Sequence, residues 1–168
     1  MHDAKIQIRQ VDKVFSSQGR HVQALQDVSL DIQRNEFITF VGASGCGKST
    51  LLRSIGGLEQ HSAGEILVDG RAVNGPGIDR AMVFQHYSLY PWLKVMQNIK
   101  FCRQLKVVSD SVRSDADIEV ASGRADALLS LMGLSAFAEA YPNQLSGGMQ
   151  QRVAIARALM PKPEILLM

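Results

Sequence analysis

Hydrophobic and polar positions in the first part of the chain alternate as they do in β-strands. Apolar residues recur among polar neighbours on both sides of a turn region at residues 16–19. They are Ile6, Ile8, Val11, Leu25, Val28, Leu30 and Ile32. Residues 37–41 (Phe-Ile-Thr-Phe-Val) then form an almost continuous apolar run, rich in β-branched and aromatic residues. Such a run is typical of a strand buried on both faces, so we expect a core strand there.

A helical pattern follows a glycine-rich turn at residues 42–47. The predicted helix begins at Lys48 and ends at Gly56–Gly57. Further strands are expected at residues 65–68 and 81–84, and a turn is expected at residues 69–70.

The second half of the chain is predicted to be mostly helical. Residues 94–140 lack strand alternation and indicate a helical insertion. Ser146 suits the N-cap of a last helix, in which apolar residues recur at helical spacing. These residues are Met149, Val153, Ala156 and Met160. Pro161 and Pro163 end that helix, and residues 164–168 start another buried strand. The order of strand, loop, helix and strand indicates an α/β core with a helical subdomain.

Composition narrows the class of protein. The 168 residues are enough for one domain with a real core, and 46% hydrophobic with 20% charged residues fits a soluble globular protein. A formal net charge of +2 gives no case for a nucleic-acid partner. The two cysteines, Cys46 and Cys102, suggest neither a disulfide framework nor a zinc site. No apolar run approaches the ~20 residues that cross a bilayer, so a membrane role would need a partner.

The glycine-rich turn carries the first chemical motif. Residues 42–49 fit G-x-x-x-x-G-K-[ST], the phosphate-binding P-loop, between an expected strand and an expected helix. Its backbone N–H groups would surround phosphate oxygens of ATP, Lys48 would reach the β- and γ-phosphates, and Ser49 would coordinate Mg²⁺. The expected phosphate-binding residues are Gly42, Ala43, Ser44, Gly45, Cys46, Gly47, Lys48, Ser49 and Thr50. The alternative is a glycine-rich turn with an incidental Gly-Lys-Ser.

A second motif identifies a family. Residues 145–152 (Leu-Ser-Gly-Gly-Met-Gln-Gln-Arg) resemble the signature motif L-S-G-G-x-Q of ABC transporter ATP-binding subunits. The motif opens a helix, whose N-terminus favours an anion. In that family it closes over the γ-phosphate held by the P-loop of a second subunit, a role that falls here to Ser146, Gly147, Gly148 and Gln150. An ordinary Ser-capped helix is the alternative.

The resemblance implies a fold and further site residues. The implied fold is α/β: a P-loop NTPase core with an N-terminal antiparallel β subdomain and an inserted helical subdomain, C-terminally incomplete. Residues 1–93 would form the β subdomain and P-loop core, 94–145 the helical subdomain, and 146–168 the signature helix and the next strand. Gln85 would contact Mg²⁺ and the attacking water, and with Lys48 it forms the expected catalytic pair. Phe15 would stack on adenine beside Val22, although a core aromatic is the alternative for Phe15.

A narrower resemblance concerns transport. Residues 76–80 and 90–93 look like those of importers of the nitrate, sulfonate and taurine group. The alternative is that they are loop residues shared by many importers. This implies three partners: a second copy of the chain, a transmembrane permease and, indirectly, a periplasmic substrate-binding protein. The subunit would sit at the cytoplasmic face of the membrane. Five residues either line the groove for the permease or pack in the core: Tyr87, Leu89, Tyr90, Trp92 and Leu93.

The expected catalytic machinery extends past the last residue. The family pattern continues with an Asp for Mg²⁺, a Glu as general base and a switch histidine, whereas the sequence stops at Met168. None of the four histidines, His2, His21, His61 and His86, stands where the switch histidine belongs. We therefore expect a chain that binds nucleotide, is marginally stable and has at most weak ATPase activity. A truncated non-catalytic nucleotide-binding protein and a soluble non-transport ABC ATPase are the alternatives.

Overall fold

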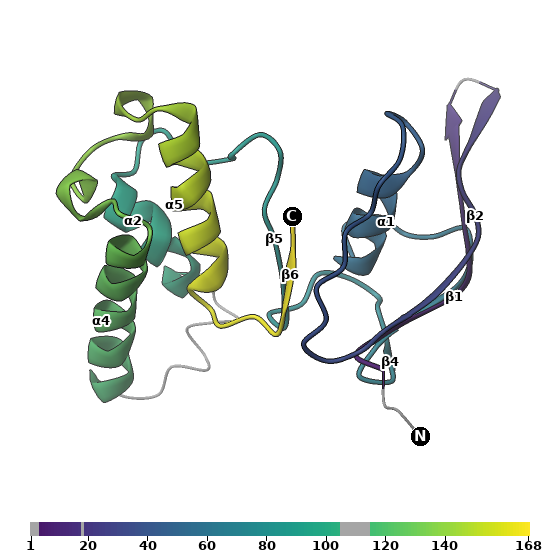
Figure 1. The fold of residues 1–168 in the computed structure, drawn as a ribbon, viewed down its shortest axis with the longest axis horizontal. Coiled ribbons are helices and arrows are strands. Elements are labelled where there is room, and N and C mark those ends of the chain that lie inside the picture. Colours follow the sequence, from purple (N-terminus) through teal and green to yellow (C-terminus); the bar gives the residue numbers. More distant parts are fainter. Residues whose placement is uncertain (1–3, 18, 105–114) are drawn as a thin grey trace. The chain divides into compact units, whose positions relative to one another are not determined.

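The chain forms two compact units in its computed structural model, residues 1–77 and 78–168. The structure describes residues 4–17, 19–104 and 115–168. Figure 1 shows the β-rich first unit and the mainly helical second unit.

The first unit is built on a four-stranded antiparallel sheet with the strand order β2-β1-β3-β4. Its strands are β1 (Ile6–Ser17), β2 (Arg20–Ile32), β3 (Ala63–Val68) and β4 (Arg71–Ala72), and the helix α1 spans Lys48–Ile55. The alternating residues of the sequence supply its core, as predicted. Buried there are Ile6, Ile8, Val11, Leu25, Ile32, Ile66 and Val68 from the sheet, with Leu51 and Ile55 from α1.

The predicted turn at residues 69–70 is confirmed. Asp69 and Gly70 both have positive φ, 49° and 71°, and connect β3 to β4. The buried Lys5 donates a hydrogen bond of 2.5 Å to Asp69, and this bond lowers the pKa of the Asp69 carboxyl.

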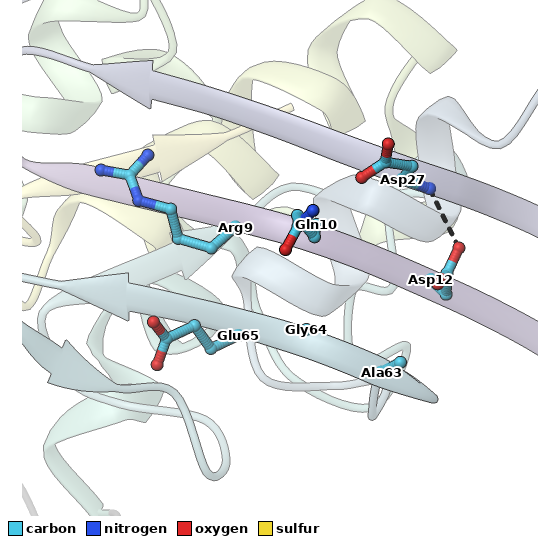
Figure 2. Close-up of a pocket in the computed structure, with 7 residues that line it drawn as sticks. All are labelled: Arg9, Gln10, Asp12, Asp27, Ala63, Gly64 and Glu65. Atoms are coloured by element: carbon cyan, nitrogen blue, oxygen red, sulfur yellow. Dashed lines mark hydrogen bonds between the residues drawn. The ribbon is translucent and has the colours of Figure 1, made fainter.

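Bulges in the hairpin of β1 and β2 create an open hollow over the sheet (Figure 2). Gln10 and Asp27 line it and both have a φ of 46°. The Asp12 carboxylate accepts the Asp27 amide at 2.9 Å, so it holds the bulge of β2 in place. On the facing strand, a Cβ atom at Gly64 would lie 2.3 Å from the Gln10 carbonyl oxygen. Glycine is therefore required at this crossing of β1 and β3.

The core strand expected at residues 37–41 is not formed. Phe37 is 88% exposed and Val41 89% exposed, and no strand is assigned to these residues. An apolar run becomes a buried strand only where other strands flank it and other elements cover it. The described sheet of this unit ends at β2 and β4, and none of its strands pairs with residues 37–41. The prediction was wrong because it used composition without the neighbours that burial needs.

The second unit joins a small parallel sheet to a helical cluster. The strands β5 (Arg80–Met82) and β6 (Ile165–Leu167) pair in parallel, which confirms both predicted strands. Only one face of β6 is buried, because Leu166 remains 38% exposed. The helices are α2 (Val95–Lys100), α4 (Asp115–Leu131) and α5 (Gly147–Leu159), with 3₁₀ turns η1 (Phe101–Gln104), η2 (Ser135–Phe137) and η3 (Pro142–Gln144).

The helical cluster confirms the helices expected within residues 94–140, of which residues 105–114 lie outside the described part. Helices α2, α4 and α5 pack on one another around a common apolar core (Figure 1). That core contains Val95, Ile99, Ala125, Leu128, Leu129, Leu134, Leu145, Val153, Ala156 and Met160. Arg124 donates hydrogen bonds to the carbonyls of Leu159 and Met160, which caps the C-terminal end of α5. None of the described helices has the length and hydrophobicity that crossing a bilayer requires.

We predict that Gly64→Ala destabilises the first unit far more than Gly70→Ala. Both positions have positive φ, but only a Cβ atom at Gly64 meets backbone, whereas nothing lies within 4 Å of one at Gly70. Gly70→Ala should cost about 1 kcal/mol of unfolding free energy, and Gly64→Ala at least about 2 kcal/mol. Urea denaturation followed by circular dichroism measures both. Equal losses would contradict the close crossing at Gly64.

Candidate nucleotide-binding site

The glycine-rich loop curls around the side chain of Lys48. The ammonium of Lys48 donates hydrogen bonds of 2.7 Å to the carbonyl oxygens of both Gly42 and Ala43. The first hydrogen bond of α1 runs from the Leu51 amide to the Gly47 carbonyl at 2.9 Å. The amides of Lys48, Ser49 and Thr50 precede it, so α1 offers them no acceptor. A cation and a set of N–H groups at a helix N-terminus together form a site for an anion.

Close contact with the sheet explains the last glycine of the loop. Gly47 has a φ of 93°, and a Cβ atom there would lie 2.2 Å from the Ala24 carbonyl oxygen. Ala24 lies at a bulge of β2, because Leu25 pairs with Lys13 and Gln23 with Val14. The loop is thus seated on the backbone of β2, and no side chain fits between them.

The predicted adenine contacts are an exposed apolar pair in the same unit. Phe15 and Val22 face each other across β1 and β2 and are 39% and 60% exposed. Phe15 is therefore not part of the buried core, and the ammonium of Lys13 lies 4.7 Å from the centre of its ring. The phosphate loop contacts β2 at Ala24. Val22 lies two residues earlier on the same strand, about 7 Å away along the strand.

The sequence predicts the Ser49 hydroxyl as an oxygen ligand for Mg²⁺ in this unit. Ser49 is exposed in the first turn of α1, beside the free amides of the helix. A hydroxyl is a hard oxygen ligand of the kind that Mg²⁺ prefers, so the residues present fit the ion. Among residues 4–17, 19–104 and 115–168, no group of three or more His, Cys, Asp and Glu side chains is placed to hold a metal.

Gln85, the second predicted metal contact, lies in the other unit. It is exposed and follows the end of β5 by three residues. The Val83 amide extends the pairing of β5 by donating to the Leu167 carbonyl at 2.8 Å. Since Gln85 and Ser49 belong to different units, their joint role at Mg²⁺ stays a prediction.

The signature residues stand at the start of α5 as the sequence predicted. The Ser146 hydroxyl accepts the Met149 amide at 3.4 Å, so Ser146 is the N-cap. Gln150 turns back and donates to the carbonyls of Pro142 and Leu145, and the buried Leu145 anchors the turn in the helical core. Ser146, Gly147 and Gly148 are all exposed.

The two glycines of this motif have different surroundings. A Cβ atom at Gly147 would lie 3.1 Å from the Tyr87 hydroxyl oxygen, whereas nothing lies within 4 Å of one at Gly148.

The five residues that were expected to line a groove or pack in the core divide between the two environments. Leu89 packs against the helical core, and the ring of Tyr90 contacts those of Trp92 and Phe101 at 5.5 and 4.3 Å between centroids. Trp92 is 69% exposed. Tyr87 and Leu93 are half-buried.

Two residues of this region were missed by the sequence analysis. Asn98 is fully buried; its side-chain oxygen accepts the Tyr90 amide, and its amide group donates to the carbonyls of Tyr90 and Leu93. Arg157 donates to the carbonyls of Tyr87 and Ser88. The available signal was a polar residue within an apolar helical face at Asn98, and a basic residue in the last turn of the helix at Arg157.

The three histidines that the structure describes lie outside the phosphate loop and the signature turn. The His21 ring nitrogen Nδ1 lies 2.8 Å from the Ser16 hydroxyl, and His86 is exposed. His61 lines a small hollow near the end of α1, and His2 lies outside the described residues.

Comparison with known proteins decides the family. The sequence model of the family described as "ABC transporter" matches residues 25–168. The chain belongs to the ABC transporter family. Its α/β fold, a P-loop NTPase core with an antiparallel β subdomain and a helical subdomain, confirms the predicted fold class.

Relatives of this ABC protein include named importer subunits. The chain is 47% identical over 164 residues to an uncharacterised ABC transporter ATP-binding protein of Methanocaldococcus jannaschii, covering 98% of the chain and 58% of that protein. Identity is 48% over 163 residues with the nitrate import ATP-binding protein NrtD of Synechocystis, covering 97% and 58%. It is 43% over 157 residues with the aliphatic sulfonates import ATP-binding protein SsuB of Bacillus subtilis, covering 94% and 57%. The chain thus spans less than two thirds of the length of these relatives.

A solved ABC structure resembles the chain closely. The ATP-binding cassette MJ0796, a dimer bound to ADP and Pi in a post-hydrolysis state, superimposes with a TM-score of 0.83 at 34% identity. The match covers 96% of this chain and 72% of that one.

We predict that alkylation of Cys46 weakens ATP binding to this ABC chain by at least about tenfold. Cys46 is exposed in the loop, and its sulfur lies 3.5 Å from the Lys48 ammonium, so an adduct would occupy the space of a phosphate. The measurement is the Kd of a fluorescent ATP analogue after N-ethylmaleimide treatment in a Cys102→Ser background, with labelling checked by mass spectrometry. Cys46→Ser should resist the reagent. Unchanged affinity after complete labelling would show that the nucleotide does not bind at this loop.

Proposed function

We propose that the chain is the ATP-binding and ATP-hydrolysing part of an ABC importer's energy-coupling subunit, of the nitrate, sulfonate and taurine type. One observation carries the proposal. In a chain of this family, a phosphate loop closed around Lys48 occurs together with an exposed Ser146-Gly147-Gly148 turn at the start of α5.

The chain's own ATP would bind along the first unit. The adenine would lie on Phe15 and Val22, an exposed apolar pair about two strand residues from the seat of the loop. The phosphates would bind residues 42–50, where the amides at the start of α1 and the Lys48 ammonium offer donors and positive charge. Ser49 and Gln85 would hold Mg²⁺, which when bound neutralises developing charge on the β- and γ-phosphates.

For hydrolysis, Lys48 and Gln85 have separate tasks. Lys48 would stabilise the negative charge of the γ-phosphate in the transition state. Gln85, whose amide offers both a donor and an acceptor, would orient the attacking water. 

The second ATP contact would come from another copy of the chain. An exposed helix N-terminus with two glycines allows a phosphate to approach the backbone closely. Nothing in the described part of the chain lies within 4 Å of a Cβ atom at Gly148, so the chain's own packing does not require glycine there. A phosphate held by a second subunit would explain it, and the ABC cassette MJ0796 is a dimer bound to ADP and Pi.

The relatives' names support the remaining proposed partners. Proteins named for nitrate import and for aliphatic sulfonates import match 94–97% of this chain. A transmembrane permease would bind the subunit at the cytoplasmic face of the membrane and receive substrate from a periplasmic binding protein. The exposed Trp92, beside Tyr90, offers an aromatic surface for the permease.

We predict that Lys48→Ala lowers the affinity for ATP by at least about tenfold while leaving the fold intact. The substitution removes the charge that the loop surrounds, and a charge-assisted hydrogen bond contributes roughly 1.5–3 kcal/mol. Isothermal titration with ATP measures the loss, and circular dichroism checks the fold. Arg53→Ala, an exposed basic residue in the last turn of α1, is the matched control and should bind normally. Equal binding by wild type and Lys48→Ala would refute the site.

We predict that Gly148→Leu separates ATP binding from self-association. No described atom lies within 4 Å of a Cβ atom at Gly148, so the Kd for ATP should stay within about twofold, while the ATP-dependent dimer should weaken at least about tenfold. Sedimentation velocity with and without ATP gives the dimerisation constant. Leu131→Ala, at an exposed apolar position of α4, is a control for general surface effects. A dimer that survives Gly148→Leu would place the signature motif outside the interface.

A further inference from the structure

The loop that carries Gln85 is held at both of its ends. Before Gln85, the Val83 amide is bonded to the Leu167 carbonyl of β6 at 2.8 Å. After it, the Tyr87 and Ser88 carbonyls accept hydrogen bonds of 3.3 and 2.8 Å from Arg157 of α5. Only residues 84–86 lie between these two anchors, so their geometry sets the place of Gln85.

Arg157 is suited to fix the orientation of the backbone at Tyr87 and Ser88 as well as its distance from α5. Two nitrogens of its planar guanidinium reach two successive carbonyls, and its central carbon lies 5.5 Å from the centre of the Tyr90 ring. Burial lowers the pKa of Arg157 from its ordinary value, yet a guanidinium stays charged in proteins. A rigid fork over an aromatic face holds a backbone more tightly than a flexible ammonium can.

The same segment also touches the beginning of α5. The Tyr87 ring lies against Gly147, while the Tyr87 carbonyl is bonded to Arg157 near the other end of the helix. Gly147 and Arg157 are ten residues apart, or about 15 Å along the helix axis. The segment after Gln85 therefore contacts α5 at its signature end through the Tyr87 ring and is bonded to a side chain from its last turn.

We propose that Arg157 is a positioning residue that ties the Gln85 loop to the signature helix, so that Gln85 is held in place for Mg²⁺. The inference rests on the proposed function, because that proposal supplies the role of Gln85. It goes further because it connects two contacts that belong to different ATP molecules of the proposed dimer. In that dimer Gln85 would contact the ATP bound by its own chain, and the start of α5 would contact the ATP bound by the second copy. Arg157 links the Gln85 loop to the helix that carries the second contact.

The rest of the segment has an anchor besides the contact of Arg157 with the Tyr90 ring. Residues 90–94 are anchored separately by the buried Asn98, which bonds to Tyr90, Leu93 and Lys94. Loss of the guanidinium should therefore release the part that carries Gln85 and leave Trp92 and the helical core in place.

The test is the gain in ATP affinity that Mg²⁺ provides, measured as the ratio of the Kd in EDTA to the Kd in Mg²⁺. Replacing a residue that supports a metal ligand typically costs 10–100-fold in metal affinity. We expect Gln85→Ala to lower the ratio about tenfold, Arg157→Met to lower it by a similar factor, and the double variant to show no further loss. The Kd in EDTA should stay unchanged in all three, because the phosphate loop is untouched. Arg157→Lys should give an intermediate ratio, since one ammonium replaces the two-pronged contact only in part.

Arg152→Met is the matched control. Arg152 lies on the same helix but donates to the Met132 carbonyl, away from the Gln85 loop, and should leave the ratio unchanged. Emission of Trp92, the single tryptophan of the chain, reports whether each variant keeps the packing of residues 90–94. If Arg157→Met loses the wild-type emission, the ratio measured for Arg157→Lys replaces it: a lowered ratio supports the role of Arg157, and a normal ratio overturns it.

The outcomes separate the two proposals. A normal ratio in Arg157→Met, beside a lowered ratio in Gln85→Ala, overturns the role of Arg157 and leaves the proposed function standing. Equal losses of affinity with and without Mg²⁺ in Arg157→Met also overturn it, because they indicate general damage. A normal ratio in Gln85→Ala removes Gln85 from the Mg²⁺ site and the positioning role with it. Failure of wild type to bind ATP refutes the proposed function itself.

Discussion

The contact of Gly47 with the carbonyl of Ala24 is the constraint on which the first unit depends. A backbone that approaches another backbone this closely leaves no room for a Cβ atom, and it sets where α1 begins relative to β2. The bulge of β2 at Ala24 provides the seat, while the neighbouring Val22 stays exposed. The phosphate loop and the exposed apolar pair of β1 and β2 are thus held by one strand, which keeps their spacing constant.

The second unit is organised around α5 in a comparable way. Its first turn is held by Ser146 and by Leu145 in the core, and its last turn is capped by Arg124. Between these ends, the helix packs on α2 and holds the segment after Gln85 through Arg157. The exposed first turn therefore belongs to a helix that is in contact with α2, α4 and β5.

The sequence predicted what depends on local chemistry. The ends of α1 and α5, the N-cap Ser146, the turn at Asp69–Gly70 and the strands β3, β5 and β6 all follow from residue types close together in the chain. The core strand at residues 37–41 was wrong because burial depends on flanking strands, and the described sheet supplies none there. Arg157 and Asn98 were missed because backbone carbonyls accept their hydrogen bonds. Tyr87 and Ser88 lie about 70 positions before Arg157, and any residue type could have supplied those carbonyls.

The two glycines of the signature turn show how far packing alone explains the motif. The packing of the chain itself favours glycine at position 147, since a side chain there would press on the Tyr87 hydroxyl. Gly148 has no such reason, because its surroundings within the described residues are open and glycine in a helix lowers stability by about 1 kcal/mol relative to alanine. A residue that costs stability and fills no internal need points to something outside the chain. Close approach of a phosphate from a second copy would supply that reason, so the composition of this turn supports the proposed site shared between two subunits.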